Sequence, residues 1–259
     1  MRRPPRAVLG VAGLLVVLLV VAVVVRSCTG PEKTIEVYVD ASLRHAFADL
    51  GEAFEEEHDV AVELTVDSAG GHVLTLMDSA TMPDVLAAGD PYGLVQVNGL
   101  LAGEPLVLAE DHLVIAVPRG NPAEIEDVDD LAGQEVAVCH INEACGRLAH
   151  FALLSAGIEV RPVEGSESAA TTAEVVEGEV DAGLVLASEA DAAGDAVEVI
   201  ELPWAGDRVS YPSISLLDGG PDPDEGQEFI DFVVGETGQE ILADHGFAPA
   251  ENPHLQPED

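Results

Sequence analysis

The chain has 259 residues, of which 47% are hydrophobic, and it carries 49 acidic residues against ten lysines and arginines. The resulting net charge of −39 repels the phosphates of nucleic acids and anionic lipid headgroups, so nucleic-acid binding is excluded. The length and the apolar content are sufficient for one large domain or for two modest lobes.

The N-terminal segment, residues 1–28, predicts an export signal or a membrane anchor. Arginines near the start precede an apolar run at residues 7–25, which is close to the length of a membrane span. Cys28 follows this run, where a bacterial lipoprotein would be cleaved and lipidated, although Arg26 departs from the usual small residue. Both alternatives attach the rest of the chain to the outer face of the cell membrane through a short tether at residues 29–33.

The first strand and helix after this tether meet at a serine. Apolar residues alternate from Ile35 to Val39, which predicts a strand, and they recur at helical intervals from Leu43 to Phe54. Ser42 lies between the two runs and is a preferred N-cap residue. Such a turn gathers unpaired N–H groups, a hydroxyl and the positive end of a helix dipole. It therefore fits either an ordinary capped helix or a site for an anion.

The same arrangement recurs in the next segment. Residues 60–66 predict a second strand, and residues 67–71 predict a turn before a helix that includes residues 72–77. This turn contains Ser68 and two glycines, which allow a backbone to approach a ligand closely. Residues 83–88 predict a third strand, short and buried in character.

The remaining elements continue the alternation of strands and helices. Further strands are predicted at residues 113–117, 135–139, 158–163, 182–186, 197–202 and 213–217, and helices at residues 127–131, 146–156, 169–177, 224–234 and 237–245. Gly157 is expected to be the left-handed cap of one helix, and Ser168 is expected to be the N-cap of the next. Residues 251–259 are polar and contain proline, which predicts a disordered tail.

Two cysteines remain as a pair if Cys28 is lipidated. Cys139 and Cys145 are six residues apart, and thiols of exported proteins tend to oxidise, so a disulfide that closes a short loop is favoured. The alternative is a metal site formed by Cys139, His140 and Cys145.

The order of elements predicts an α/β fold with two lobes, each a mostly parallel sheet flanked by helices. We expect residues 34–116 and 212–250 to form lobe 1 and residues 117–211 to form lobe 2, with two crossings that make a hinged cleft. In such sheets ligands lie at the carboxyl ends of the strands, where the serine-bearing turns fall.

An ordered set of short segments between about Lys33 and Phe247 resembles a known family. The segments are Val39-Asp-Ala-Ser-Leu43, Met82-Pro-Asp-Val85, the strand Leu113 to Pro118, Ala144-Cys-Gly-Arg-Leu-Ala149, Gly183-Leu-Val-Leu-Ala-Ser188, Val209-Ser-Tyr-Pro-Ser213 and Gly246-Phe247. In this order they resemble the periplasmic molybdate-binding proteins of ABC importers, which have the type II periplasmic-binding fold.

The resemblance implies a tetrahedral oxyanion, molybdate or tungstate, held by serine hydroxyls and by backbone N–H groups at helix starts. Ser42 matches the first ligand serine, and the turn with Ser68 and Ala69 matches the second ligand segment. Cys145 and Ser168 match positions that offer backbone N–H groups. The cysteine pair resembles a variant found in some relatives.

One position departs from this family pattern. Leu186 stands where many members have a tyrosine, whose hydroxyl binds the oxyanion. A hydrogen bond to a charged group contributes about 1.5–3 kcal/mol, so leucine is expected to cost roughly one to two decades of affinity. Sulfate is a smaller oxyanion that only the size of the cavity could exclude.

The resemblance also implies an importer permease and its ATPase as partners, a monomer, and no cofactor. The sequence contains no Gly-x-Ser-x-Gly elbow, Walker motif or HExxH motif, so we do not expect an enzyme. His45, His72 and His140 fall near the predicted cleft loops. A divalent cation such as zinc is therefore an alternative ligand, although solvated or packed histidines are the favoured interpretation.

Overall fold

The computed structural model describes residues 33–79, 81–164, 168–202 and 209–250. The predicted anchor with Cys28 and the predicted C-terminal tail lie outside these residues. Lys33, expected at the end of the tether, is the first residue of a strand. Among the described residues, no helix has the length and apolar character needed to cross a membrane.

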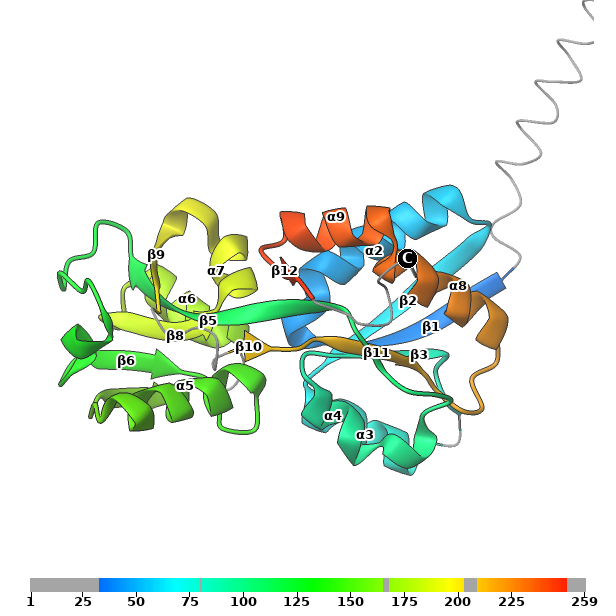
Figure 1. The fold of residues 1–259 in the computed structure, drawn as a ribbon, viewed down its shortest axis with the longest axis horizontal. Helices are drawn as coiled ribbons and strands as arrows, with labels where there is room; N and C mark the ends of the chain where they lie inside the picture. Colours follow the sequence, from blue (N-terminus) through cyan, green and yellow to red (C-terminus); the bar gives the residue numbers. More distant parts are fainter. Residues whose placement is uncertain (1–32, 80, 165–167, 203–208, 251–259) are drawn as a thin grey trace, which may run out of the picture.

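The protein consists of two lobes, each built on a β-sheet (Figure 1). The sheet of lobe 1 has the strand order β2-β1-β3-β11-β4. Its strands are β1 (Lys33–Asp40), β2 (Val60–Asp67), β3 (Val85–Ala88), β4 (Leu106–Val107) and β11 (Ser213–Leu216). The first three are parallel to one another, whereas β11 pairs antiparallel with both β3 and β4.

Helices cover both faces of this first sheet. They are η1 (Ala41–Leu43), α2 (Arg44–Glu57), α3 (Ala69–Asp78), α4 (Pro91–Gln96), η2 (Asn98–Leu100), α8 (Pro223–Val234) and α9 (Glu236–Asp244). Helices α2, α8 and α9 lie on one face, and α3 and α4 lie on the other (Figure 1).

The sheet of lobe 2 has the strand order β10-β5-β8-β6-β7, and β9 and β12 also pair with β5. Its strands are β5 (Ala109–Pro118), β6 (Glu135–Val138), β7 (Arg161–Glu164), β8 (Ala182–Leu186), β9 (Val197–Glu201), β10 (Val209–Ser210) and β12 (Ala248–Pro249). Its helices are η3 (Val128–Leu131), α5 (Ala144–Ala156), α6 (Ser168–Glu177), α7 (Ala187–Ala193) and η4 (Gly194–Ala196). Strands β7, β6 and β8 are parallel, and β5 runs against them.

Two extended segments connect the lobes. Strand β5 leaves lobe 1 and enters the sheet of lobe 2, and the segment from β10 to β11 runs back (Figure 1). The two crossings are bonded to each other, since the N–H of Leu108 donates to the carbonyl of Pro212 at 2.7 Å. The lobes are thus joined by a paired connection close to their interface.

The core of lobe 1 contains the apolar residues that alternate along β1 and those that recur at helical intervals along α2. Ile35, Val37 and Val39 are fully buried on one side of β1, as alternation predicts. Phe47 and Phe54 are fully buried on α2 and meet Phe229 of α8, with ring centres 6.2 and 5.2 Å apart. Each such side chain contributes about 1.5–3 kcal/mol through its removal from water, so this cluster fixes β1 and α2 relative to each other.

Candidate functional site

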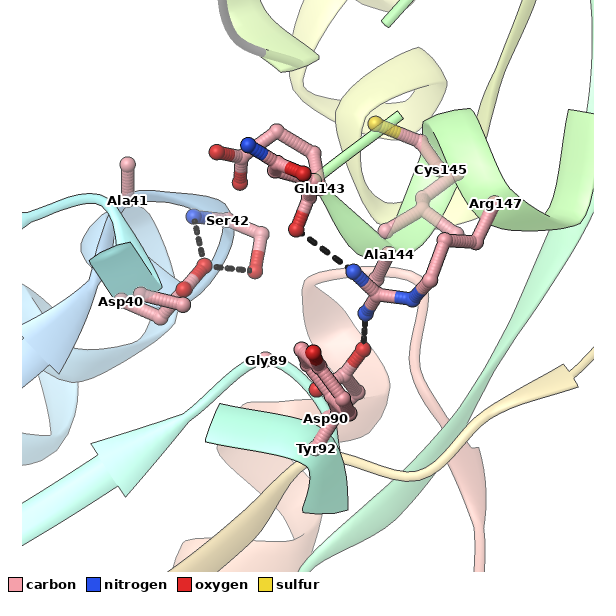
Figure 2. Close-up of a pocket in the computed structure, with 13 residues that line it drawn as sticks. Asp40, Ala41, Ser42, Gly89, Asp90, Tyr92, Glu143, Ala144, Cys145 and Arg147 are labelled. Atoms are coloured by element: carbon pink, nitrogen blue, oxygen red, sulfur yellow. Dashed lines mark hydrogen bonds and ion pairs between the residues drawn. The ribbon is translucent and has the colours of Figure 1, made fainter. Parts of the chain in front are cut away.

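A pocket lies between the lobes, where loops from both sheets converge (Figure 2). Lobe 1 contributes Asp40, Ala41, Ser42, Ala69, Gly89, Asp90 and Tyr92; lobe 2 contributes Asn142, Glu143, Ala144, Cys145, Arg147 and Leu186. Most of these residues follow the carboxyl ends of β1, β2, β3, β6 and β8. This is the edge where α/β sheets bind ligands, and three predicted site residues, Ser42, Ala69 and Cys145, lie in its wall.

The turn after β1 differs from the sequence expectation. Ser42 is not the N-cap of α2, because the short helix η1 intervenes and Leu43 holds that position. Asp40 caps η1 instead: its Oδ1 accepts the backbone N–H of Ser42 at 3.0 Å and the hydroxyl of Ser42 at 2.7 Å. An aspartate two residues before a free N–H is a strong local acceptor, and the sequence analysis overlooked this signal.

In the turn after β2, the two predicted ligand residues Ser68 and Ala69 have different roles. Ser68 is the N-cap of α3, and its Oγ accepts the N–H of Gly71 at 3.1 Å. The helix begins at Ala69, so the predicted turn is shorter than expected. Ala69 lines the pocket, whereas Ser68 does not. The hydroxyl of Ser68 therefore serves the helix end, and Ala69 carries this segment's contribution to the wall.

The turn after β3 supplies a wall that the sequence analysis did not identify. A Cβ atom on Gly89 would lie only 2.5 Å from Ser42 Oγ and 2.8 Å from Asp40 Oδ1, so the close approach requires glycine. From the other side, the hydroxyl of Ser210 donates to the carbonyl of Gly89 at 2.7 Å. The adjacent Asp90 accepts the N–H of Gly93 and caps α4.

The cysteine pair forms a disulfide, as predicted. Cys139 and Cys145 are bonded with their Cα atoms 5.8 Å apart, and both are buried. The bond closes the loop that leads into α5, whose first N–H groups lie at the pocket, where Ala144 and Cys145 form part of the wall. The alternative metal site is wrong, because both thiols are consumed by the disulfide and His140 is exposed.

Arg147 is the only cationic side chain that lines this pocket among the described residues. Its guanidinium pairs with Asp90 of lobe 1, donates to the carbonyl of Asn142 at 2.5 Å and lies 5.0 Å from the ring centre of Tyr92 (Figure 2). Partial burial lowers the pKa of Arg147, and the negative charge of Asp40 acts in the opposite direction. The pocket thus holds three carboxylates and one guanidinium.

Comparison with known proteins decides the family. Residues 35–248 match the bacterial extracellular solute-binding proteins. The chain belongs to this family. The molybdate-binding protein ModA of Mycobacterium tuberculosis is 32% identical to this solute-binding protein over 222 residues, which are 83% of this chain and 85% of the relative. The family and this relative are extracellular solute-binding proteins and are not enzymes.

Solved structures confirm the fold. The substrate-binding domain of a putative molybdenum ABC transporter from Clostridium difficile superimposes with a TM-score of 0.70 at 20% identity, covering 85% of this chain and all of that one. The periplasmic molybdate-binding protein of Azotobacter vinelandii gives a TM-score of 0.70 at 16% identity, covering 84% and 100%. The sulfate-binding protein SubI of Mycobacterium tuberculosis gives 0.68 at 17%, covering 86% and 88%.

Leu186 and Ser168 are the remaining positions of this solute-binding protein that the family resemblance singled out. Leu186 lines the pocket and packs on the disulfide, and it offers no hydroxyl there. Ser168 is the first residue of α6, a helix that contacts η1 of lobe 1. The N-cap of α6 falls outside the described residues, so a contact between Ser168 and the ligand stays a prediction.

The three histidines do not form a cation site. His45 is exposed on α2, and His140 is exposed after β6. His72 is buried behind the pocket, stacks at 4.9 Å on Tyr38 and is hydrogen-bonded through Nε2 to the carbonyl of Val39 at 2.9 Å. Within the described ranges, no group of three or more His, Cys, Asp or Glu residues could hold a metal ion.

Proposed function

We propose that this protein captures a tetrahedral oxyanion, molybdate or tungstate, outside the cytoplasm and delivers it to the permease and ATPase of an ABC importer. The observation that carries the proposal is the identity to ModA over 83% of the chain, combined with a pocket that gathers the loops of both lobes. The segments matched by the family resemblance, around Ser42, Ala69 and Cys145, meet in that pocket.

The chemistry of the pocket supports a small anion despite the acidic surface. The turn at Ser42 and the start of α5 at Ala144 face each other across the cleft, and the start of α5, which has no side-chain cap, offers backbone N–H groups. Arg147 adds one positive charge. The repulsion from distant surface carboxylates is screened over about 10 Å at 0.1 M salt, so short-range donors decide whether an anion binds.

The proposal includes how the protein is placed at the membrane and how it is divided. Residues 1–28 would attach it as an uncleaved anchor or through lipidated Cys28, and the protein would act as a monomer. The sequence predicts residues 34–116 and 212–250 in lobe 1 and residues 117–211 in lobe 2. The return from β10 to β11 supports the boundary near residue 212, whereas residues 113–116 of β5 already pair with β8 of lobe 2, so the first crossing lies before them.

Titration calorimetry of the detergent-solubilised full chain tests the proposed function. Molybdate and tungstate should bind, and each should raise the melting temperature, since a ligand at 100 times its Kd stabilises by about 2.7 kcal/mol. Sulfate should bind more weakly, and zinc should not stabilise the protein. Stabilisation by zinc alone, or no response to any oxyanion, would contradict the proposal.

A serine substitution tests the site itself. Ser42→Ala removes a hydroxyl from the pocket wall, and the loss of one bond to a charged ligand should weaken molybdate binding about ten- to a hundredfold. Ser155→Ala is the matched control, because Ser155 is an exposed residue of α5 away from the pocket. An unchanged Kd in Ser42→Ala would show that the hydroxyl only supports the local turn.

A further inference from the structure

The donors of Ser42 are already in use within the protein. Both its N–H and its hydroxyl donate to the same oxygen, Oδ1 of Asp40, at 3.0 and 2.7 Å. Asp40 is 5% exposed and lines the pocket, so this carboxylate lies inside the proposed oxyanion site. Figure 2 shows the interaction on the side of the pocket that lobe 1 forms.

An oxyanion cannot use the hydroxyl of Ser42 while Asp40 holds it. A serine hydroxyl has a single hydrogen to donate, and the oxygens of a carboxylate and of an oxyanion are both acceptors. The two groups also repel each other as like charges at short range. The backbone at Gly89 closes this side of the pocket, since even a Cβ atom there would collide with Asp40 Oδ1 and Ser42 Oγ.

We propose that Asp40 is a built-in competitor of the ligand: its carboxylate accepts both donors of Ser42 and turns away from them when an anion binds. This inference rests on the proposed function. The carboxylate satisfies a partly buried N–H and a partly buried hydroxyl at the pocket wall. In the occupied site its displacement lowers the net affinity, and its return helps to expel the anion.

The other charges of the pocket are consistent with this exchange. Asp90 pairs with Arg147, and the donors of Ser42 are bonded to Asp40. Asp40 and Arg147 both line this pocket, and the charge of Asp40 opposes the lowering of the pKa of Arg147 that partial burial causes. Arg147 is therefore the nearby cation toward which a displaced Asp40 can turn.

Removal of the charge of Asp40 should tighten oxyanion binding. Asp40→Asn keeps an acceptor for the N–H of Ser42 but competes less strongly than a carboxylate. In calorimetric titrations of the full chain with molybdate, this variant should lower Kd at least tenfold, which corresponds to about 1.4 kcal/mol. Stopped-flow measurements should assign most of the change to a slower koff, because the internal carboxylate no longer drives release.

Glu52→Gln is the control for the loss of one surface charge, since Glu52 is exposed on α2 in the same lobe. It should leave Kd within twofold of the wild type. If Asp40→Asn does not fold, Asp40→Ser provides a second neutral cap with the same expected gain.

An unchanged or higher Kd in a folded Asp40 variant would overturn the inference, because Asp40 would then be a structural cap or a direct ligand contact. That result leaves the proposed function standing, since the wild type would still bind molybdate. If neither the wild type nor the variant binds any oxyanion, the proposed function fails, and the inference fails with it.

Discussion

Two arginines join the lobes at opposite sides of the cleft, and they do so in different surroundings. Arg44 of α2 makes two bonds to Glu189 of α7, at 2.9 and 3.2 Å, and the Glu189 side chain is 3% exposed. Arg147 of α5 pairs with Asp90, whose side chain is 14% exposed, and its guanidinium lines the ligand pocket.

The two ion pairs differ in how deeply their carboxylates are buried, and therefore in how well water could replace a lost partner. Glu189 is almost fully buried and would hold an uncompensated charge without Arg44, so we call this pair the clamp between the lobes. Arg147 is 30% exposed and can exchange its partner for water, Asp40 or an anionic ligand. The two arginines are similarly exposed, at 26% and 30%, so the difference between the pairs lies in the carboxylate, which is 3% exposed in Glu189 and 14% exposed in Asp90.

Removal of the clamp should give the largest loss of stability. Arg44→Ala leaves Glu189 as an uncompensated buried charge, and breaking one half of such a pair costs about 3–5 kcal/mol. Arg147→Ala, on the pocket side, should cost only about 1 kcal/mol. Urea unfolding of both variants measures the contrast, and Arg161→Ala, from an exposed pair with Glu135, should be nearly neutral. Equal losses in Arg44→Ala and Arg147→Ala would refute the distinction.

The free energy of unfolding should depend on pH through a buried carboxyl next to the clamp, that of Asp111. Asp111 of β5 accepts the hydroxyl of Ser188 at 2.6 Å, and burial raises its pKa to about 7, with the charge of Glu189 adding to the rise. The folded state then binds this proton more tightly than the unfolded state does, so the contribution of Asp111 to stability is fully present below about pH 4 and is lost as the pH rises to 7.

Asp111→Asn should flatten that part of the pH profile. The difference in unfolding free energy between wild type and variant should change by up to about 1.4 kcal/mol per pH unit between pH 4 and 7. Asp195→Asn, an exposed aspartate of η4, is the control. Parallel profiles for wild type and Asp111→Asn would show that the carboxyl of Asp111 ionises normally in the folded protein.

A smaller loss of stability than for Arg44→Ala is expected from reduction of the disulfide, which supports the pocket side. Reduction of Cys139–Cys145 reopens a short loop, and the chain-entropy estimate for such a loop is about 2 kcal/mol. Hydrogen exchange should rise in the first turn of α5 and stay unchanged in α7, on the clamp side. Increased exchange in both helices would mean that the two sides of the cleft are not independent.

Strong local periodicity explains what the sequence could predict. Alternation predicted β1 and the helical repeat predicted α2, whereas α3 begins at Ala69, three residues before the predicted helix. Gly157 has the left-handed backbone expected of its cap, with φ of 70°. The disulfide was predicted from the exported location. In each case the deciding residues are close together in the sequence.

The features that escaped prediction depend on contacts that are distant in sequence or on one inserted turn. The pairing of β12 with β5 joins segments more than 130 residues apart, and the Arg44–Glu189 pair spans 145 residues. Neither leaves a local pattern. η1 is a single turn, yet it transferred the capping role from Ser42 to Asp40 and changed which group holds the donors of the pocket.

The bond from Ser210 to the carbonyl of Gly89 connects the returning crossing to the wall of the pocket. Because Ser210 belongs to β10, which pairs with β5, any bending of the inter-lobe connection pulls on the same peptide that confines Asp40 and Ser42. The connection between the lobes and the pocket wall thus share one peptide. A permease that moved the lobes apart would be expected to shift this wall and weaken the binding of the anion in the same movement.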